Sequence, residues 1–80
     1  MVTSRQVRAA RALLGWTQEL LADKALVALT SLKRLESDRL KVRDDTRDQV
    51  RRALEAAGVV FLASGRGEGV MLVRDPKARR

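Results

Sequence analysis

The 80-residue chain contains neither cysteine nor histidine. It therefore lacks the most frequent protein ligands of zinc, iron and copper, the commonest general base at neutral pH, and the thiolate nucleophile. Its serines have no histidine to activate them, and disulfide bonds cannot form. From these absences we expect no metal or other cofactor, no small-molecule substrate and no enzymatic activity.

Long apolar runs are also missing. The first eight residues carry charge but hold no apolar segment of the kind found in secretory signals. No stretch approaches the roughly 20 apolar residues that span a bilayer. We expect a cytoplasmic protein without a membrane partner.

Aromatic residues are scarce, since the chain has one Trp, one Phe and no Tyr. Recognition of a nucleic-acid single strand by base stacking uses several aromatic side chains, so this sequence supports it poorly. Trp16 precedes a helix cap, where a large apolar residue usually joins the core, and we assign it to the core. A chain of this length forms one domain with a modest core, which disfavours a deep substrate cleft.

Positive charge is abundant: 17 Lys and Arg residues face 10 Asp and Glu residues, giving a formal net charge of +7. A field of this sign attracts polyanions, nucleic acid before an acidic membrane or an acidic protein. Residues 28–43 hold five basic and two acidic residues, whereas residues 44–58 hold three basic and four acidic ones. Arg5, Arg8 and Arg11 recur at a spacing of three and are expected to line one exposed flank.

The apolar periodicity predicts four helices. Thr3 and Gln6 form a capping-box pattern before the first helix, and Gly15 supplies its C-terminal stop. Thr17 is a good N-cap for the second helix, which a very tight turn joins to the third. The expected helices cover residues 4–14, 18–25 and about 28–37, followed by one that Asp44 or Asp45 caps and Gly58 ends.

Beyond Gly58 the apolar period changes to two. Residues 59–63 and 70–73 flank the glycine-rich segment 64–69, which predicts a β-hairpin with a long loop. Both faces of this hairpin are apolar, so one face can pack on the helices while the other needs cover. We expect a homodimer in which the hairpins meet edge to edge or face to face. The interface candidates are Val59, Val60, Phe61, Leu62, Val70, Met71, Leu72 and Val73.

Residues 15–36 hold the most informative motif. Gly15-Trp16-Thr17-Gln18, Leu21-Ala22 and Leu32-Lys-Arg-Leu-Glu36 resemble the phage-repressor, or xenobiotic-response-element, family of helix-turn-helix transcription regulators. The resemblance covers about residues 4–54, and the continuation resembles short single-domain members from alphaproteobacteria. It implies a mainly α fold: a four-helix repressor-like domain over residues 1–58, a β-hairpin for dimerisation over 59–74, and a frayed basic tail over 75–80.

A short helix, a tight turn and a second helix present the latter as a rod that fits the DNA major groove. The resemblance places Leu29, Thr30, Lys33 and Arg34 at base-reading positions, where Lys33 or Arg34 can reach guanine and Leu29 a thymine methyl. It also implies that Gln18, at a helix N-terminus, clamps a phosphate. Further phosphate candidates are Thr17, Arg5, Ser37, Arg39, Lys41 and Arg43.

Two residues depart from the family pattern. The family usually has glycine at the position of Leu26, because the turn there needs a positive φ, and a leucine in that conformation costs roughly 1–2 kcal/mol. Ala28 stands where a serine or threonine often caps the recognition helix, and alanine forfeits about 1 kcal/mol. The turn is therefore either rebuilt or strained, and the start of the third helix is open.

Together these features predict a sequence-specific regulator that binds double-stranded DNA as a dimer, on an inverted repeat, and lies on the nucleoid when bound. The alternative is an antitoxin-like interaction module that binds a partner protein through the hairpin or the third helix.

Overall fold

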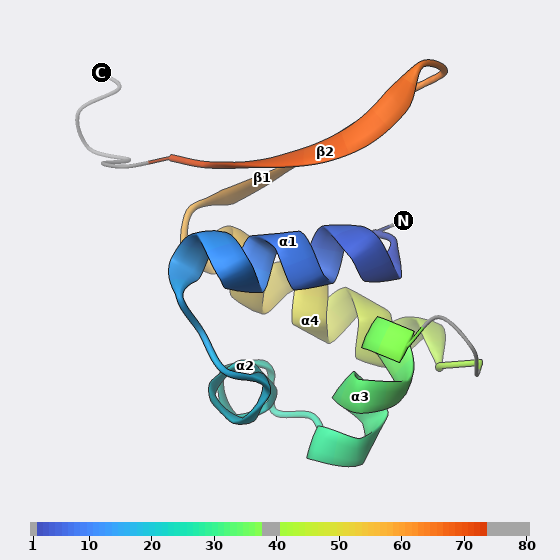
Figure 1. Ribbon diagram of the computed structural model, residues 1–80. Helices are drawn as coiled ribbons and strands as arrows, with labels where there is room; N and C mark the ends of the chain where they lie inside the picture. Colours follow the sequence, from blue (N-terminus) through green and yellow to red (C-terminus); the bar gives the residue numbers. More distant parts are fainter. Residues whose placement is uncertain (1, 38–40, 74–80) are drawn as a thin grey trace.

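The computed structural model describes residues 2–37 and 41–73 (Figure 1). Its elements are α1 (Ser4–Leu14), α2 (Gln18–Ala25), α3 (Leu29–Ser37), α4 (Asp44–Ala56), β1 (Val59–Ser64) and β2 (Gly67–Leu72). The predicted mainly α architecture with a C-terminal hairpin is confirmed. The expected tail, residues 75–80, lies outside the described residues.

The first helix begins and ends as its sequence predicts. The Thr3 hydroxyl accepts from the Gln6 N–H at 3.1 Å, and the Gln6 side chain accepts from the Thr3 N–H at 3.0 Å, which completes the capping box. Gly15 closes the helix in the left-handed conformation with φ 70°. Because these signals lie at the ends of the helix itself, the local sequence determines where α1 begins and ends.

One apolar core joins all four helices. Its largest fully buried side chains are Val7 of α1, Leu21 of α2, Leu32 and Leu35 of α3, and Val50 and Leu54 of α4. Leu32 and Leu35 are three residues apart, so α3 presents one stripe inward and leaves the opposite face in solvent.

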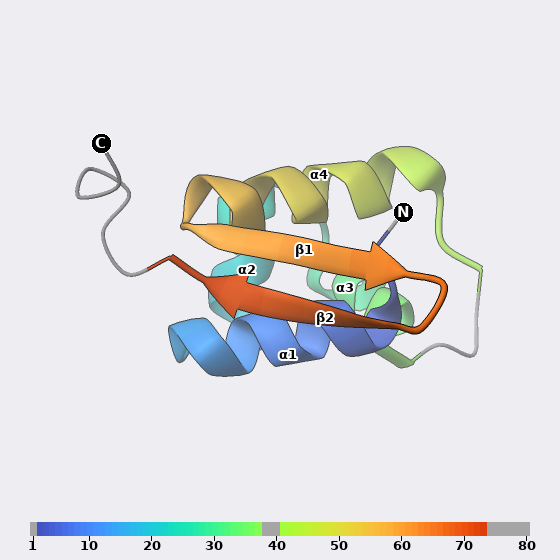
Figure 2. The same cartoon turned by 90° about the horizontal axis from the view of Figure 1, so that it is seen from above.

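The hairpin lies across α1 and α4, on the side of the molecule away from α2 and α3 (Figures 1 and 2). β1 and β2 pair antiparallel from Val59↔Leu72 to Ser64↔Gly67. The Gln6 amide nitrogen of α1 donates to the carbonyls of both strands, at Leu62 and Gly69, each at 2.9 Å. This buried side chain therefore fixes the hairpin on α1.

The predicted long hairpin loop was wrong. The strands continue through the glycine-rich segment, and only Gly65 and Arg66 form the turn. Gly67 and Gly69 lack strand propensity, but the backbone of a two-residue hairpin can pair without side-chain support.

Half of the predicted interface side chains pack on this chain's own helices. Val59 is buried, and Phe61, Val70 and Leu72 pack against the core. Val60, Leu62, Met71 and Val73 alternate with them and face outward. The eight interface candidates therefore divide between the two faces of the hairpin: four pack on the helices and the other four face outward.

The predicted cap of α4 was also wrong. Arg43 occupies the N-cap without a side-chain hydrogen bond, and Asp44 and Asp45 are in the first turn. Carboxylates there still favour the helix through its dipole. At the other end Ala57 is the C-cap, and Gly58 turns the chain into β1 with φ 104°.

The sequence left open whether the turn at Leu26 is rebuilt or strained, and the structure has the strained turn. Leu26 has φ 59° and ψ 43°, the one left-handed non-glycine residue in the described chain, and its side chain is 83% exposed. We expect Leu26→Gly to raise the free energy of unfolding by about 0.5–1 kcal/mol, because relief of the strain exceeds the extra chain entropy of glycine. Chemical denaturation measures the change.

The control variant for this effect is Leu26→Ala, which keeps the strained φ while it removes the same exposed side chain. It should leave stability within about 0.5 kcal/mol of the parent. Equal changes in the two variants would show that the conformation of residue 26 is not the cause.

Candidate nucleic-acid interface

A three-residue connection, residues 26–28, sets α3 against α2. The Thr17 hydroxyl caps α2 by accepting from the Leu20 N–H at 3.0 Å. In the connection, the Val27 N–H donates to the Ala22 carbonyl at 3.1 Å, and the Ala28 carbonyl accepts from the Leu32 N–H at 3.1 Å. The third helix thus begins at Leu29, one residue later than expected, with Ala28 as a cap that has no side-chain acceptor.

The outward face of α3 carries most of the predicted base-reading residues. Thr30, Lys33 and Arg34 are exposed, whereas Leu29 is half-buried and packs partly on the core. Within residues 2–37 and 41–73, neither Lys33 nor Arg34 has an ion-pair partner. The charges on this face are therefore available to an external anion.

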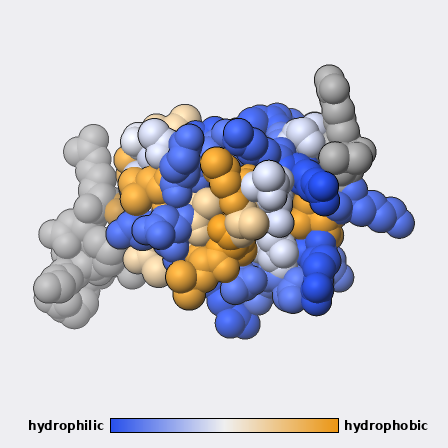
Figure 3. All heavy atoms as spheres, turned by 90° about the horizontal axis from the view of Figure 1, so that it is seen from below, coloured by the Kyte–Doolittle hydropathy of each residue, from blue (hydrophilic) through white to orange (hydrophobic). Residues whose placement is uncertain are grey.

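The side of the molecule formed by α2 and α3 has a mixed surface. Viewed from this side, a hydrophobic strip crosses the middle, with hydrophilic residues on either side of it (Figure 3). Leu26 is the most exposed large apolar residue of the described chain. The major groove of DNA has a similar division, because apolar thymine methyls lie among the base edges and charged phosphates lie on either side.

A largely buried ion pair, which was not predicted from the sequence, holds α3 in place. Arg11 of α1 makes two bonds to the Glu36 carboxylate, Nε–Oε2 at 2.7 Å and Nη2–Oε1 at 2.9 Å. Arg11 also donates to the Trp16 carbonyl at 3.0 Å, and Arg8 donates to the backbone carbonyl of Glu36. Arg11 therefore does not belong to an exposed flank, which corrects that expectation.

Gln18 joins the same cluster. Its amide nitrogen donates to Glu36 Oε1 at 3.0 Å, so its side chain points into the domain at the start of α2. The signal for the cluster was present in the sequence: Glu36 falls four residues after Leu32, on the inward stripe of α3, where a carboxylate needs a cationic partner.

The remaining phosphate candidates are dispersed. Arg5 pairs with Glu68 of β2 at 3.0 Å, on the hairpin side of α1, and Arg43 pairs with Asp45 at 3.3 Å. Lys41 is exposed, and the Ser37 hydroxyl donates to the Arg34 carbonyl at 2.9 Å. Arg39 lies outside the described residues. Of the phosphate candidates, Thr17 and Gln18 therefore lie at the start of α2 beside α3, whereas Arg5 lies on the hairpin side of the molecule.

Several carboxylates outside α3 pair with arginines of the same chain. Arg51 and then Arg52 lower the pKa of Asp48 by hydrogen bonding and charge, and Arg51 also pairs with Glu55 at 2.9 Å. On β2, hydrogen bonds from Arg5 and then Thr3 lower the pKa of Glu68. These carboxylates neutralise arginines of α1 and α4. By contrast, Lys33 and Arg34 of α3 have no ion-pair partner among the described residues.

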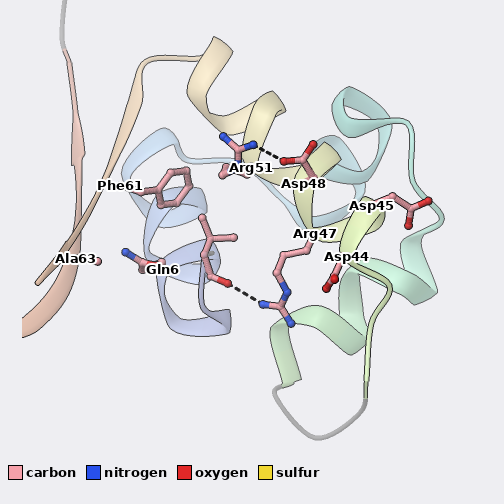
Figure 4. A pocket seen from close by; sticks show the side chains of 9 residues that line it. Gln6, Asp44, Asp45, Arg47, Asp48, Arg51, Phe61 and Ala63 are labelled. Atoms are coloured by element: carbon pink, nitrogen blue, oxygen red, sulfur yellow. Dashed lines mark hydrogen bonds and ion pairs between the residues drawn. The ribbon is translucent and has the colours of Figure 1, made fainter. Parts of the chain in front are cut away.

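A groove of about 740 Å³ runs between β1 and the N-terminal half of α4 (Figure 4). Phe61 and Ala63 of β1 form one wall, and Asp48 and Arg51 the other. The groove opens beside the outer edge of β1. Arg51 is held by Asp48, as the dashed line shows, so the charged wall is neutralised within the chain.

Comparison with known proteins assigns no family. No protein-family model matches the chain, and no curated protein matches it. Within the described ranges, no helix has the length and apolarity needed to cross a membrane, and no three metal-ligating side chains gather.

Proposed function

We propose that this protein is a sequence-specific, double-stranded DNA-binding regulator in which α2 and α3 form a helix-turn-helix unit. The observation that carries the proposal is the division of α3 into two faces. Leu32 and Leu35 are buried, while Lys33 and Arg34 are exposed and have no ion-pair partner in the described chain. Such a helix can enter the major groove without losing its place in the core.

In this proposal the residues of α3 read base edges. Lys33 and Arg34 donate to N7 and O6 of guanine, and Thr30 donates to or accepts from a neighbouring base. The exposed part of Leu29 contacts a thymine methyl. The free N–H groups at the start of α2, beside Thr17 and Gln18, position a phosphate and fix the register of α3.

The protein acts as a homodimer on an inverted repeat. One copy of α3 covers only a few base pairs, and a two-fold dimer doubles the contacts on a site with the same symmetry. The half-sites are expected about one helical turn apart, on the order of 10 base pairs.

Selection of bound duplexes from a random library at near-physiological salt tests this function. We expect enrichment of an inverted repeat in which each half-site holds at least one guanine. Recovery of unenriched duplexes, with binding that disappears as salt rises, would indicate a nonspecific polycation.

A second candidate is an antitoxin-like module that binds a protein. It is favoured by the exposure of Leu26 beside α3, an apolar feature that a protein surface covers well. Alanine at Lys33 and Arg34 separates the two, because DNA reading depends on these cations, whereas apolar docking at Leu26 does not.

A further inference from the structure

The hairpin has an unprotected edge on β1. Proteins usually block exposed strand edges with lysine, proline or a bulge. The β1 sequence Val-Val-Phe-Leu-Ala-Ser has no charged residue and no proline, and its six residues pair with β2 without a bulge. In a chain with 34% charged residues, a strand of this composition is unusual.

The register shows which backbone groups of β1 face outward. The Val73 N–H donates to the Gly58 carbonyl at 2.8 Å, so this pair is hydrogen-bonded. In an antiparallel ladder bonded and non-bonded pairs alternate, and Phe61↔Val70 and Ala63↔Glu68 are therefore non-bonded pairs. The N–H and C=O groups of Phe61 and Ala63 point away from β2, toward the groove beside α4.

The β2 edge is less suited to pairing. Its outward groups include those of Glu68, which is charged and held by Arg5 and Thr3. β2 also packs closely on α1, whereas β1 has the open groove at its side. That groove leaves the β1 edge open to an added strand.

We infer that β1 of one copy pairs antiparallel with β1 of a second copy, making one four-stranded sheet from two hairpins. An uncharged edge suits self-association of a chain with a net charge of +7, because like charges oppose contact elsewhere. In the symmetric register Phe61 is opposite Phe61 of the partner subunit, and the grooves of the two copies adjoin at the junction. This inference rests on the proposed function, because it assigns the interface of the proposed homodimer to the β1 edge.

The arrangement agrees with DNA binding on one duplex. The hairpin and the α2–α3 unit lie on opposite sides of the α1–α4 layer (Figure 1). Edge-to-edge pairing leaves the helices of both copies on one side of the shared sheet, so both α3 helices face the same way. Stacking of the outer hairpin faces would direct them apart.

Cysteine crosslinking in the absence of DNA tests the pairing, since the chain has no cysteine. The matched variants are Leu62→Cys on β1 and Met71→Cys on β2, which are 48% and 49% exposed and both face outward. In the symmetric register the two Leu62 positions are one strand spacing apart and staggered by two residues, about 8 Å, whereas the two Met71 positions are three strand spacings apart with the same stagger, about 16 Å. A thiol reagent that spans about 8 Å should therefore crosslink Leu62→Cys at least about tenfold more efficiently.

Each other outcome overturns the inference. Efficient crosslinking of both variants would indicate stacked outer faces, preference for Met71→Cys would indicate the β2 edge, and no crosslinking of either would indicate that β1 edges do not meet. Circular dichroism verifies that both variants fold. Because DNA is absent, these results are separable from failure of the proposed function, which the duplex selection reports.

A second variant removes an outward N–H without a change of charge. Ala63→Pro deletes the donor that faces the partner and leaves the bonds to β2 intact. In sedimentation experiments we expect a dimer dissociation constant at least about tenfold higher than that of the parent, because two symmetric hydrogen bonds are lost. An unchanged constant in a folded variant would contradict pairing at this edge.

Discussion

Replacement of both Lys33 and Arg34 with alanine is expected to remove the preference for the enriched duplex and to leave the fold intact. Both side chains are exposed, so little intramolecular packing is lost. A well-placed contact with a base contributes about 1–3 kcal/mol of discrimination. The two losses together correspond to a fall in specificity of roughly 30-fold to 10⁴-fold. Titration of the enriched duplex and of a shuffled duplex measures this ratio.

A control with the same charge change is Arg51→Ala combined with Arg52→Ala on α4. These arginines pair with Asp48, so they neutralise acids of their own helix. The control should weaken binding to both duplexes by a similar, small factor and keep their ratio. If the two double variants lose specificity equally, net charge and not the α3 face determines recognition.

Glu36→Ala is expected to lower the free energy of unfolding by about 3–5 kcal/mol, because Arg11 is left partly buried without its carboxylate. The loss is a large part of the 5–15 kcal/mol typical of a small domain. Glu36 also binds Gln18, so the variant should loosen the start of α2 relative to α3. Urea denaturation at neutral pH measures the change.

Glu55→Ala is the matched control, since Glu55 pairs with Arg51 on the exposed surface of α4. An exposed pair contributes about 0–1 kcal/mol. The double variant Arg11→Met with Glu36→Leu should recover most of the stability, because it removes the buried charges together. A cost for Glu36→Ala no larger than that for Glu55→Ala would contradict the structural role of the pair.

The sequence predicted the helices well where the signals are local. Thr3, Thr17 and Gly15 act within one helical turn, and the stripe of Leu32 and Leu35 repeats at the helical period. The hairpin turn was mispredicted because glycine is typical of loops, yet Gly67 and Gly69 pair in the ladder. Backbone pairing, which has no side-chain signature, decided that boundary.

The candidate site was predictable only in part. The outward residues of α3 follow from its apolar stripe, whereas the sequence left open whether the turn at Leu26 is rebuilt or strained. The ion pairs between residues distant in sequence could not be predicted: Arg11 and Glu36 are 25 residues apart, and Arg5 and Glu68 are 63 apart. Arg5 and Arg11 recur at a spacing of three, and this spacing alone does not tell whether they face solvent, a phosphate or a carboxylate of the same chain. Only the tertiary structure brings Glu68 and Glu36 next to them.

The most direct measurement of the central claim is the ratio of affinities for the enriched duplex and a shuffled duplex of equal composition, followed over increasing salt. Both affinities should fall as counterions are released, with a slope near −0.9 for each phosphate contacted. We predict that the ratio stays at about 10³ or more, because base contacts release few ions. A ratio near one at every salt concentration would contradict sequence reading by α3.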